Sequence, residues 1–385
     1  MRLLFVTPTP PDRDDRDGMT QIAFRLIPEL ARQHMIDVWT LHDSDQVIRI
    51  PAARETRVFP QTTPSIVSHY LGPRHWPYFL MRHESPALHQ ALRELQPNAY
   101  DLIVIHSPFM THYLPDVQIP AVVHVFDALS DWFPKAAEKE SNIVKRAHLR
   151  AEGRAALQIE QAILPQAKAL VVVSETDAAT LQHTTPMVPT TIIPIGIDTT
   201  TLYPPTTPRD PATVVLTGVM SYPPNIDAAT WFVAEVWPSV VEQHPQAKLR
   251  IVGKDPARAV QALSSATNVT VTGRVPSMAE ELRRATVAVS PLRFGTGYKI
   301  KVNEALACGA PLVASPVSLP GTGVIPNQHC LVAENTAEWI AHVTLLLRDA
   351  SRRTALSEQA VTFAATRAWP KIAEQYEHVY AAVTK

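Results

Sequence analysis

Cysteine, long apolar runs and net charge are all scarce in this chain of 385 residues. Its two cysteines, Cys308 and Cys330, offer neither a disulfide framework nor a four-ligand metal site. No apolar run approaches about 18 residues, so the sequence predicts no transmembrane helix. A formal net charge of −1 argues against a dedicated nucleic-acid binder. Because Met1 leads directly into a predicted strand, we expect no signal peptide and a soluble, reduced, cytoplasmic protein.

Glycine is also scarce, and its distribution is uneven. The chain has 12 glycines against 35 prolines, and most of the glycines lie between Gly196 and Gly323. Glycine is favoured where the backbone adopts unusual dihedral angles or closely approaches another group. The second half of the chain is therefore predicted to hold a ligand with its backbone.

The most informative segment follows a short buried strand at 287–290. A loop containing Gly295 and Gly297 comes next, then a predicted helix at 298–307 and a second apolar run at 311–314. This order predicts a βαβ unit, in which the helix N-terminus offers unpaired N–H groups to an anion. A lone Gly-x-Gly is weak evidence for a nucleotide site by itself.

The spacing of charged residues on this predicted helix adds detail. Lys301 and Glu304 share one face, whereas Lys299 is displaced by about 140° from Glu304 on a regular helix. A diphosphate at the glycine loop and hydroxyl groups further along would suit this pattern, because a carboxylate accepts hydrogen bonds from hydroxyls. The alternative is a surface helix carrying an ordinary Lys–Glu pair.

The length predicts two α/β domains. We place an N-terminal domain at 1–203, a Pro-rich linker at 204–211, and a C-terminal domain at 212–366 that is predicted to hold the ligand. Residues 367–385 are predicted to form a helix that packs back on the first domain. In the second domain three predicted strands finish at Gly218, Gly253 and Gly273, which would line one wall of a cleft.

Candidate residues in the first domain are fewer. Gly18 follows the first predicted strand, in the loop where open α/β sheets bind ligands. Asp127 ends another predicted strand and is either a cleft residue or a cap of the next helix.

Two further segments carry clustered aromatic or basic residues. Residues 60–86 are aromatic and basic, and residues 135–154 are basic with apolar residues between. Each predicts contact with an anionic membrane surface, or more simply an irregular segment packed on the first domain and a solvated helix face.

Short motifs also recur in a fixed order along nearly the whole chain. They comprise Gly18 after a Pro-Pro turn, then 173–175, 193–198, 217–218, 224–225, 252–253, 271–275 and 291–307. In this order they resemble the glycosyltransferase family 4 enzymes of GT-B architecture, and within them the sugar transferases of bacterial exopolysaccharide and exosortase systems. The resemblance implies two Rossmann-like domains facing each other across a cleft. It also implies retaining, metal-independent transfer from a nucleotide-diphosphate sugar, in which the donor's own phosphate oxygen can serve as base.

Three departures from the family pattern affect this expectation. The first Glu of the family's Glu-x7-Glu motif is replaced by Thr296, and the usual Arg and Lys are missing from 217–225. Phosphate charge would then fall to Arg293, Lys299 and Lys301. The cleft histidine expected before Asp127 is replaced by Phe126; His124 either compensates for it or is a core residue.

The sequence thus predicts a hexosyltransferase-type enzyme acting on a UDP- or GDP-sugar and a saccharide or lipid-linked acceptor, without cofactor, metal or nucleic acid. It would be cytoplasmic or peripheral at the inner face of the membrane. Catalytic roles are predicted for Asp127 and Lys301, and acceptor-side roles for Gly18, His124 and Asp127. The predicted donor-binding residues are Gly218, Arg293, Gly295, Thr296, Gly297, Tyr298, Lys299, Lys301 and Glu304. The alternatives are a GT-B nucleotide-sugar epimerase and a non-catalytic nucleotide-sugar-binding protein.

Overall fold

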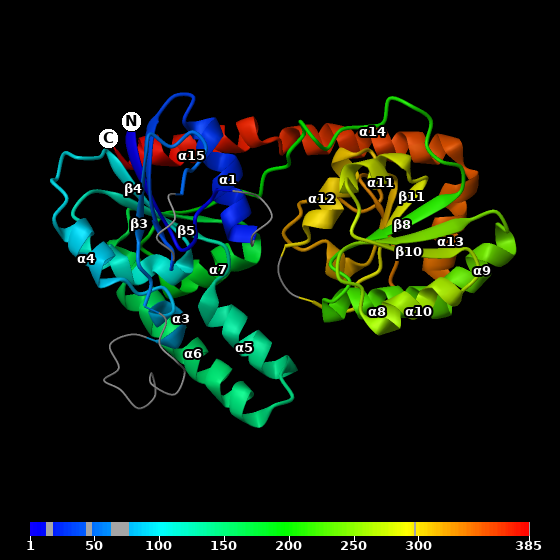
Figure 1. Cartoon of the computed structure of the whole chain (residues 1–385), viewed down its shortest axis with the longest axis horizontal. Coiled ribbons are helices and arrows are strands. Elements are labelled where there is room, and N and C mark those ends of the chain that lie inside the picture. Colours follow the sequence, from blue (N-terminus) through cyan, green and yellow to red (C-terminus); the bar gives the residue numbers. More distant parts are fainter. Residues whose placement is uncertain (13–17, 44–47, 63–76, 296–297, 385) are drawn as a thin grey trace. The chain divides into compact units, whose positions relative to one another are not determined.

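The computed structural model describes residues 1–12, 18–43, 48–62, 77–295 and 298–384. The chain forms two compact units (Figure 1). One comprises Met1–Ile195 together with Trp369–Lys385, and the other comprises Gly196–Ala368. The segment 204–211, predicted as a linker, lies within the second unit.

In its described residues, the first unit contains one sheet of seven parallel strands in the order β3-β2-β1-β4-β5-β6-β7. The strands are β1 (Arg2–Thr7), β2 (Met35–Leu41), β3 (Glu55–Phe59), β4 (Leu102–His106), β5 (Ala121–Val125), β6 (Ala169–Val172) and β7 (Thr190–Ile192). The inner strands β4, β5 and β6 are buried throughout, because helices cover both faces of the sheet.

The helices of the first unit divide between these two faces. They are α1 (Gly18–Leu30), α3 (Tyr78–Met81), α4 (Pro86–Arg93), η1 (Pro108–Asp116), α5 (Leu129–Lys139), α6 (Ile143–Ala162), η2 (Leu164–Gln166), α7 (Glu175–Thr184) and α15 (Trp369–Val383). Apolar residues of α1 and α15 share one core with β1 and β4. The other core takes residues from α4, η1 and α7. The predicted return of the C-terminal helix to the first domain is confirmed.

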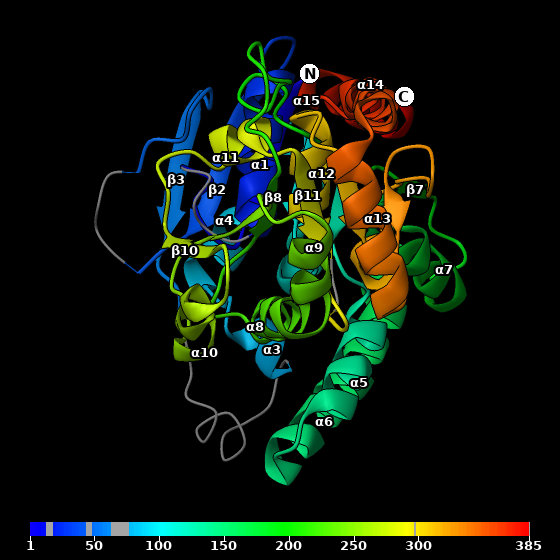
Figure 2. The same ribbon diagram turned by 90° about the vertical axis from the view of Figure 1, so that its right-hand side faces the viewer.

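The basic segment 135–154 is not one helix but parts of two. Helix α5 ends at Lys139, and Asn142 caps α6 by accepting hydrogen bonds from the backbone N–H groups of Val144 and Lys145. Both views of the ribbon show α5 and α6 as a paired hairpin that extends away from the sheet of its unit (Figures 1 and 2). The two helices can approach closely because Gly153 of α6 has no side chain. A Cβ at this position would lie only 3.0 Å from Pro134 of α5.

Only part of the aromatic segment 60–86 belongs to the described residues, since 63–76 lie outside them. In the described part, Phe79 and Leu80 are buried against Leu129 and Phe133 of α5. This agrees with the simpler interpretation, in which the segment packs on its own domain.

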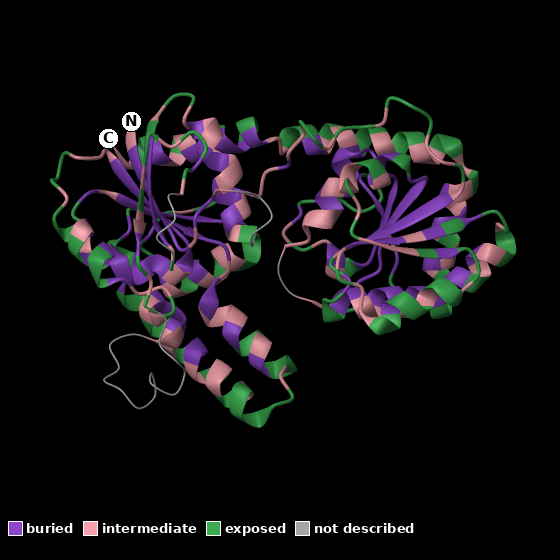
Figure 3. Cartoon of the chain, in the orientation of Figure 1, coloured by how far each residue is buried: buried purple, intermediate pink, exposed green. Residues whose placement is uncertain are grey.

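In its described residues, the second unit has a sheet of six parallel strands in the order β10-β9-β8-β11-β12-β13. They are β8 (Thr213–Thr217), β9 (Lys248–Val252), β10 (Val269–Gly273), β11 (Val287–Ser290), β12 (Leu312–Ala314) and β13 (Leu331–Val332). The strands are mostly buried between helices whose outer faces are exposed (Figure 3).

The helices of the second unit again cover both faces. They are α8 (Pro223–Trp231), η3 (Phe232–Val236), α9 (Trp237–Gln243), α10 (Arg258–Ala262), η4 (Leu263–Ser265), α11 (Met278–Arg284), α12 (Ile300–Ala307), η5 (Pro316–Ser318), α13 (Thr336–Arg348) and α14 (Ala350–Thr366). Residues of α8, α9 and α13 fill one core, and residues of α11, α12 and α14 the other. None of the described helices combines the length and apolar character needed to span a membrane.

The predicted βαβ unit is present as β11, α12 and β12, with β11 and β12 paired in parallel. The predicted start of its helix is wrong by two residues. Lys299 has non-helical dihedral angles (φ −102°, ψ 81°) and is the N-cap, so α12 begins at Ile300. The wheel argument that separated Lys299 from Lys301 therefore does not hold, because Lys299 precedes the helix.

Candidate functional site

Glycines bring the ends of three neighbouring strands close together in the second unit. The N–H of Gly218 donates to the carbonyl of Val252 over 3.1 Å, and the N–H of Gly253 donates to the carbonyl of Gly273 over 3.1 Å. A Cβ at Gly253 would lie 1.6 Å from the Gly218 carbonyl oxygen, a distance no side chain can tolerate. The carboxyl edge of this sheet is therefore backbone packed directly against backbone.

Lys301 points at this edge from α12. Its ammonium group donates to the carbonyl of Thr217, over 3.2 Å, and to Oδ1 of Asn225, over 2.7 Å. The Nδ2 of Asn225 donates in turn to the carbonyl of Val219 over 2.9 Å, which fixes the orientation of its amide. Among the described residues Lys301 has these two recorded hydrogen-bond partners, and an ammonium group has three donors. One donor is therefore left to meet a ligand.

The charges of Lys301 and Glu304 are incompletely compensated. Burial, together with the nearby charge of Lys299, lowers the pKa of Lys301 from its ordinary 10.5 to about 8, and Glu304 acts in the opposite direction. Burial also raises the pKa of Glu304, with Lys301 opposing. Within the described part of the chain, the Glu304 carboxylate has no recorded hydrogen-bond partner. Charged groups held in this way mark a candidate ligand site, because a ligand can supply the missing interactions.

The loop before α12 is only partly described. Gly295 has φ +134°, a conformation that other residues rarely adopt. Thr296 and Gly297 lie outside the described residues. The hydroxyl of Tyr298 accepts a hydrogen bond from Nδ2 of Asn303, and burial raises the Tyr298 pKa to about 12. The hydroxyl is therefore neutral at physiological pH.

Arg293, predicted as a phosphate-binding cation, already has an anionic partner. Its Nε donates to Oδ2 of Asp227 over 2.8 Å, and its Nη2 donates to Oδ1 of the same carboxylate. The guanidinium also lies 5.7 Å from the centre of the Trp231 ring. Exposed ion pairs contribute only about 0–1 kcal/mol, so a phosphate could displace Asp227 at little cost. The role of Arg293 stays a prediction.

Asp127 lies two residues after the end of β5 and is largely enclosed. Burial, together with the nearby charge of Asp177, raises its pKa from the ordinary 3.8 to about 7. The cap interpretation of Asp127 is wrong, because the N-cap of α5 is Ala128. The N–H of Ala128 donates to Oδ1 of Asp177 over 2.8 Å, so Asp177 from α7 occupies the start of this helix. Asp127 can thus exchange a proton near neutral pH, as a general acid or base must.

His124 belongs to a buried chain of hydrogen bonds. Nε2 of His106 contacts the carbonyl of Met19 at 3.0 Å, Nδ1 of His106 lies 2.9 Å from Nδ1 of His124, and Nε2 of His124 lies 2.9 Å from the Tyr380 hydroxyl. A carbonyl only accepts, so with neutral rings His106 donates to Met19, His124 donates to His106, and Tyr380 donates to His124. Complete burial lowers the pKa of His124 well below its ordinary value, which fits a neutral ring.

His124 is fully buried, and both of its ring nitrogens are used in this chain. This geometry fits the core interpretation of His124 and leaves its acceptor-side role a prediction without structural support. Gly18, the other acceptor-side residue, is the first residue of α1, with open space around its Cα. The loop residues 13–17 that precede it lie outside the described residues.

The sequence reasoning did not identify Asn225 and Thr217 as partners of Lys301. Asn225 stands in a motif that was recognised, directly after Pro224, but nothing in the motif says that its amide meets a lysine 76 positions later. The departures in 217–225 were themselves a signal. In place of the family's basic residues, this segment presents the Thr217 carbonyl and the Asn225 amide, which accept hydrogen bonds from Lys301 of α12.

Two family models match consecutive parts of the chain. The model described as "Glycosyltransferase Family 4" matches residues 16–201, and "Glycosyl transferases group 1" matches residues 211–349. The chain belongs to glycosyltransferase family 4. The matches cover both units, and the second contains the strand ends and α12.

Solved structures of similar fold cover nearly all of this glycosyltransferase. A sucrose-phosphate synthase from Thermosynechococcus elongatus is 20% identical with a TM-score of 0.70, covering 99% of both chains. Anabaena Alr3699/HepE, solved in complex with UDP, is 14% identical with a TM-score of 0.69, covering 99% of this chain and 100% of that one. Likeness at these identities supports the GT-B fold, with two Rossmann-like parallel-sheet domains.

One curated relative of the glycosyltransferase matches over a shorter region. An uncharacterized 44.6 kDa protein in the cps region of Klebsiella pneumoniae is 21% identical over 158 residues. This match covers 39% of the present chain and 41% of that protein. The chain thus spans about two fifths of the length of the curated relative it matches.

Proposed function

We propose that this protein transfers a sugar from a nucleotide-diphosphate sugar, with UDP as the nucleotide, to a saccharide or lipid-linked acceptor. The observation that carries the proposal is the position of Lys301 on α12: its ammonium bonds to Thr217 at the glycine-lined ends of β8 and β9, and Glu304 lies three residues further along the helix. Family membership supports a glycosyltransferase, and relatives of the same fold have been solved with UDP and with UDP-glucose. The cps-region relative supports a role in exopolysaccharide or glycoconjugate synthesis.

In this proposal Lys301 neutralises the charge that develops on the departing nucleotide diphosphate. Its two bonds to Thr217 and Asn225 hold the ammonium in place before the donor arrives, so little reorganisation is needed during the reaction. Glu304 accepts hydrogen bonds from the ribose hydroxyls, and the N-terminus of α12 receives a phosphate. The reaction is proposed to be retaining and metal-independent, with Asp127 as the candidate proton-exchanging group on the acceptor side.

The two rival functions differ from sugar transfer in the turnover that they predict. An epimerase would turn over a nucleotide sugar without an acceptor, whereas a binding protein would hold the donor and release no nucleotide. The purified full chain should be incubated with UDP-, GDP-, ADP- and dTDP-sugars, with and without a mixture of saccharide and lipid-linked acceptors. We expect nucleotide release with a UDP-sugar that rises when acceptor is present. Epimerised donor without nucleotide release would identify the first rival, and tight binding without turnover the second.

The exposed tip of the α5–α6 hairpin favours a second proposed partner, an anionic membrane surface. The exposed fractions of Ile143 and Val144 are 72% and 79%, beside the basic residues of α6. Lys135 and Lys145 are paired with Asp131 and Glu140, which reduces the free positive charge of the hairpin.

Flotation with anionic vesicles at low salt tests this partner. We expect the chain to bind, and the double variant Ile143→Ser/Val144→Ser to lose binding. A variant that floats as well as the unmodified chain would contradict the role of the hairpin tip.

A further inference from the structure

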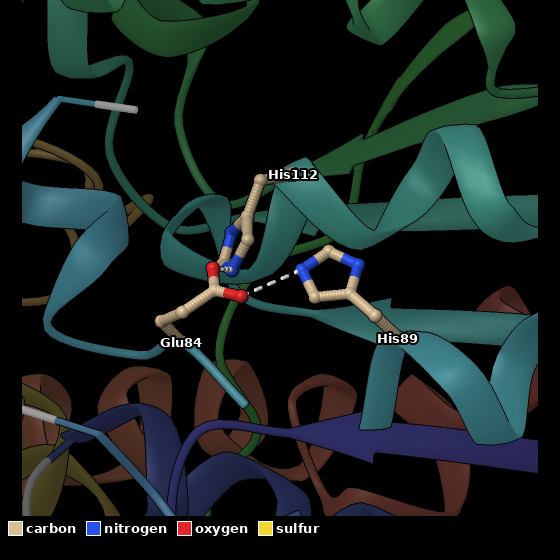
Figure 4. Close-up of side chains that lie close together, drawn as sticks. All are labelled: Glu84, His89 and His112. Carbon is tan, nitrogen blue, oxygen red and sulfur yellow. Dashed lines mark ion pairs between the residues drawn. The ribbon is translucent and has the colours of Figure 1, made fainter. Parts of the chain in front are cut away.

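A second cluster of chemically active side chains lies in the first unit. Nε2 of His89 lies 3.1 Å from Oε1 of Glu84, and Nε2 of His112 lies 3.4 Å from Oε2 of the same carboxylate. Figure 4 shows the Glu84 carboxylate between the two imidazole rings. One ligand atom from each residue lies within 4.8 Å of the others. Three metal-ligating side chains therefore converge on one point.

These distances fit a tetrahedral metal ion. Nitrogen and oxygen ligands bound to Zn²⁺ at about 2.0–2.2 Å stand roughly 3.4 Å from one another. Both pairs that include Glu84 are already near this separation, at 3.1 and 3.4 Å. Two histidines and one carboxylate are an established zinc-ligand set, with the fourth position left to water or another small ligand.

The group behind His89 is also one that a metal site needs. Nδ1 of His89 contacts Oδ2 of Asp116, whose other oxygen lies 3.1 Å from Nε of Arg93. The Tyr113 hydroxyl donates to the backbone carbonyl of His83 over 2.8 Å, and the Tyr113 ring packs against His112. A carboxylate in the position of Asp116 orients the imidazole and fixes which nitrogen faces the metal. Each histidine therefore presents its Nε2 to Glu84, and His89 is held from behind through its Nδ1.

Burial further favours this arrangement. The side chains of His112, His89 and Glu84 are 0%, 11% and 20% exposed. The Tyr113 ring packs against both imidazoles, with centroid distances of 4.3 Å to His89 and 4.1 Å to His112.

We propose that Glu84, His89 and His112 bind one divalent transition-metal ion, with Zn²⁺ the best match. The ion would join three segments: the stretch between α3 and α4, which carries Glu84, helix α4 with His89, and the 3-10 helix η1 with His112. Glu84 also pairs with Thr62 through the backbone, since the N–H of Thr62 donates to its carbonyl over 2.9 Å. The metal would thus anchor Glu84, and Thr62 through its backbone hydrogen bond, to the core of the first unit. The proposal does not depend on the sugar-transfer reaction.

The competing explanation is an ion-pair cluster without metal. Burial disfavours the charged form of His89, but its bonds to Glu84 and Asp116 outweigh this and raise its pKa. A proton on His89 could therefore take the place of the cation. The two explanations differ in whether a metal binds with one-to-one stoichiometry.

The test uses the full chain without a histidine tag, stripped of metal by a chelator. Zn²⁺ is titrated in competition with a chromophoric chelator, and Co²⁺ is added separately to record its ligand-field absorption. We expect one Zn²⁺ per chain with a dissociation constant below about 1 µM. We also expect a tetrahedral Co²⁺ spectrum and a Tm that rises by about 5 °C or more when Zn²⁺ is in excess.

Variants locate the binding site. Glu84→Gln keeps the shape of the side chain but removes the ligand charge, and should lose at least 100-fold in affinity, as should His112→Gln. Asp116→Asn, which alters only the partner of His89, should lose about 10–100-fold. The matched control is His329→Gln, a buried histidine of the second unit, which should bind Zn²⁺ like the unmodified chain.

Each result is informative because folding is checked separately by circular dichroism. Failure of the folded, metal-free chain to bind Zn²⁺ would overturn the proposal in favour of the ion-pair cluster. It would also be overturned if Glu84→Gln bound Zn²⁺ as tightly as the unmodified chain, since the metal would then lie elsewhere. Should His112→Gln fail to fold, Glu84→Gln and Asp116→Asn still decide the outcome.

Discussion

The two sheets differ in whether the polar groups near their strand ends have all their charge and hydrogen-bonding capacity compensated. In the second unit, glycines lie at the ends of β8, β9 and β10, and Lys301 bonds to Thr217 at that edge. The charges of Lys301 and of Glu304 on the same helix are only partly compensated. In the first unit, His106 and His124 lie at or near the ends of β4 and β5 and join a neutral chain of hydrogen bonds. The first arrangement suits a charged ligand, whereas the second completes a core.

The difference shows that burial of polar groups does not by itself indicate function. The His124 ring is more completely buried than Lys301, yet both of its nitrogens have partners. Lys301 has partners too, but they are a carbonyl and an amide, and neither cancels its charge. A site is better recognised by unbalanced charge than by depth of burial.

Substitution of the glycines should show the largest effect, because the second unit depends on close backbone contact. Gly253→Ala would place Cβ 1.6 Å from the Gly218 carbonyl oxygen. We expect the free energy of unfolding to fall by about 4 kcal/mol or more. The control is Gly273→Ala, where φ is +68° but no atom lies within 4 Å, and the expected loss is about 1–2 kcal/mol. Calorimetric unfolding measures both, and equal losses would contradict the packing argument.

Removal of the Lys301 charge should affect catalysis next most strongly. We expect Lys301→Ala to lower kcat by on the order of 100-fold, because one preorganised donor to the leaving diphosphate is lost. Lys299→Ala should cost clearly less, since the recorded bonds that fix an ammonium beside β8 belong to Lys301. Steady-state kinetics on the two folded variants gives the comparison. A loss at Lys299 as large as that at Lys301 would mean that the N-cap lysine carries the diphosphate.

The lowered pKa of Lys301 predicts a pH dependence of donor use. Lys301 is charged below about pH 8 and loses its proton above it, so kcat/KM for the donor should fall about tenfold per pH unit on the alkaline side. In the unfolded chain the proton is held to about pH 10.5, so the folded state binds fewer protons in this window and its stability should rise with pH. Activity and stability should thus move in opposite directions.

A pH–rate profile and a parallel unfolding series measure these two trends. The control is Lys301→Arg, whose guanidinium does not titrate in this range, so any residual activity should lack the alkaline decline. If the decline persisted in that variant, another group would be responsible.

The smallest effect is expected in the first unit. Tyr380→Phe removes the donor to Nε2 of His124 and should cost about 1–3 kcal/mol of stability, because a buried acceptor is left unsatisfied. Donor binding should not change. Tyr376→Phe is the control, since the ring of Tyr376 contacts His124 with a centroid distance of 4.8 Å and is retained. A large loss of donor affinity in Tyr380→Phe would contradict the distinction between the donor site of the second unit and the core hydrogen-bond chain of the first.

Much of the second unit was predictable, because its signals are local. The runs before Gly218, Gly253 and Gly273 are apolar and end in glycine, and each forms a strand or strand end. The start of α12 was not predictable to the residue, because Tyr298 and Lys299 are acceptable helix residues. Only the surrounding structure gives Lys299 its non-helical angles.

What the sequence could not reveal depends on contacts between distant residues. Nothing near Arg293 indicates that Asp227 neutralises it, and nothing near Asp127 indicates that Asp177 takes the start of α5. Cysteine counting argued against a four-ligand metal site but says nothing about histidine and carboxylate ligands. Glu84, His89 and His112 form no recognisable motif, and they meet only because η1 packs against α4.

The discontinuity of the first unit has a consequence for biosynthesis. Tyr376 and Tyr380 of α15 cover the same apolar surface as Leu26 and Ile27 of α1, but the ribosome translates them only after all of Gly196–Ala368. The nascent first unit must therefore wait, with that surface open to water or to a chaperone, while the second unit emerges and folds. Release of α15 from the exit tunnel would then be the event that closes the first unit.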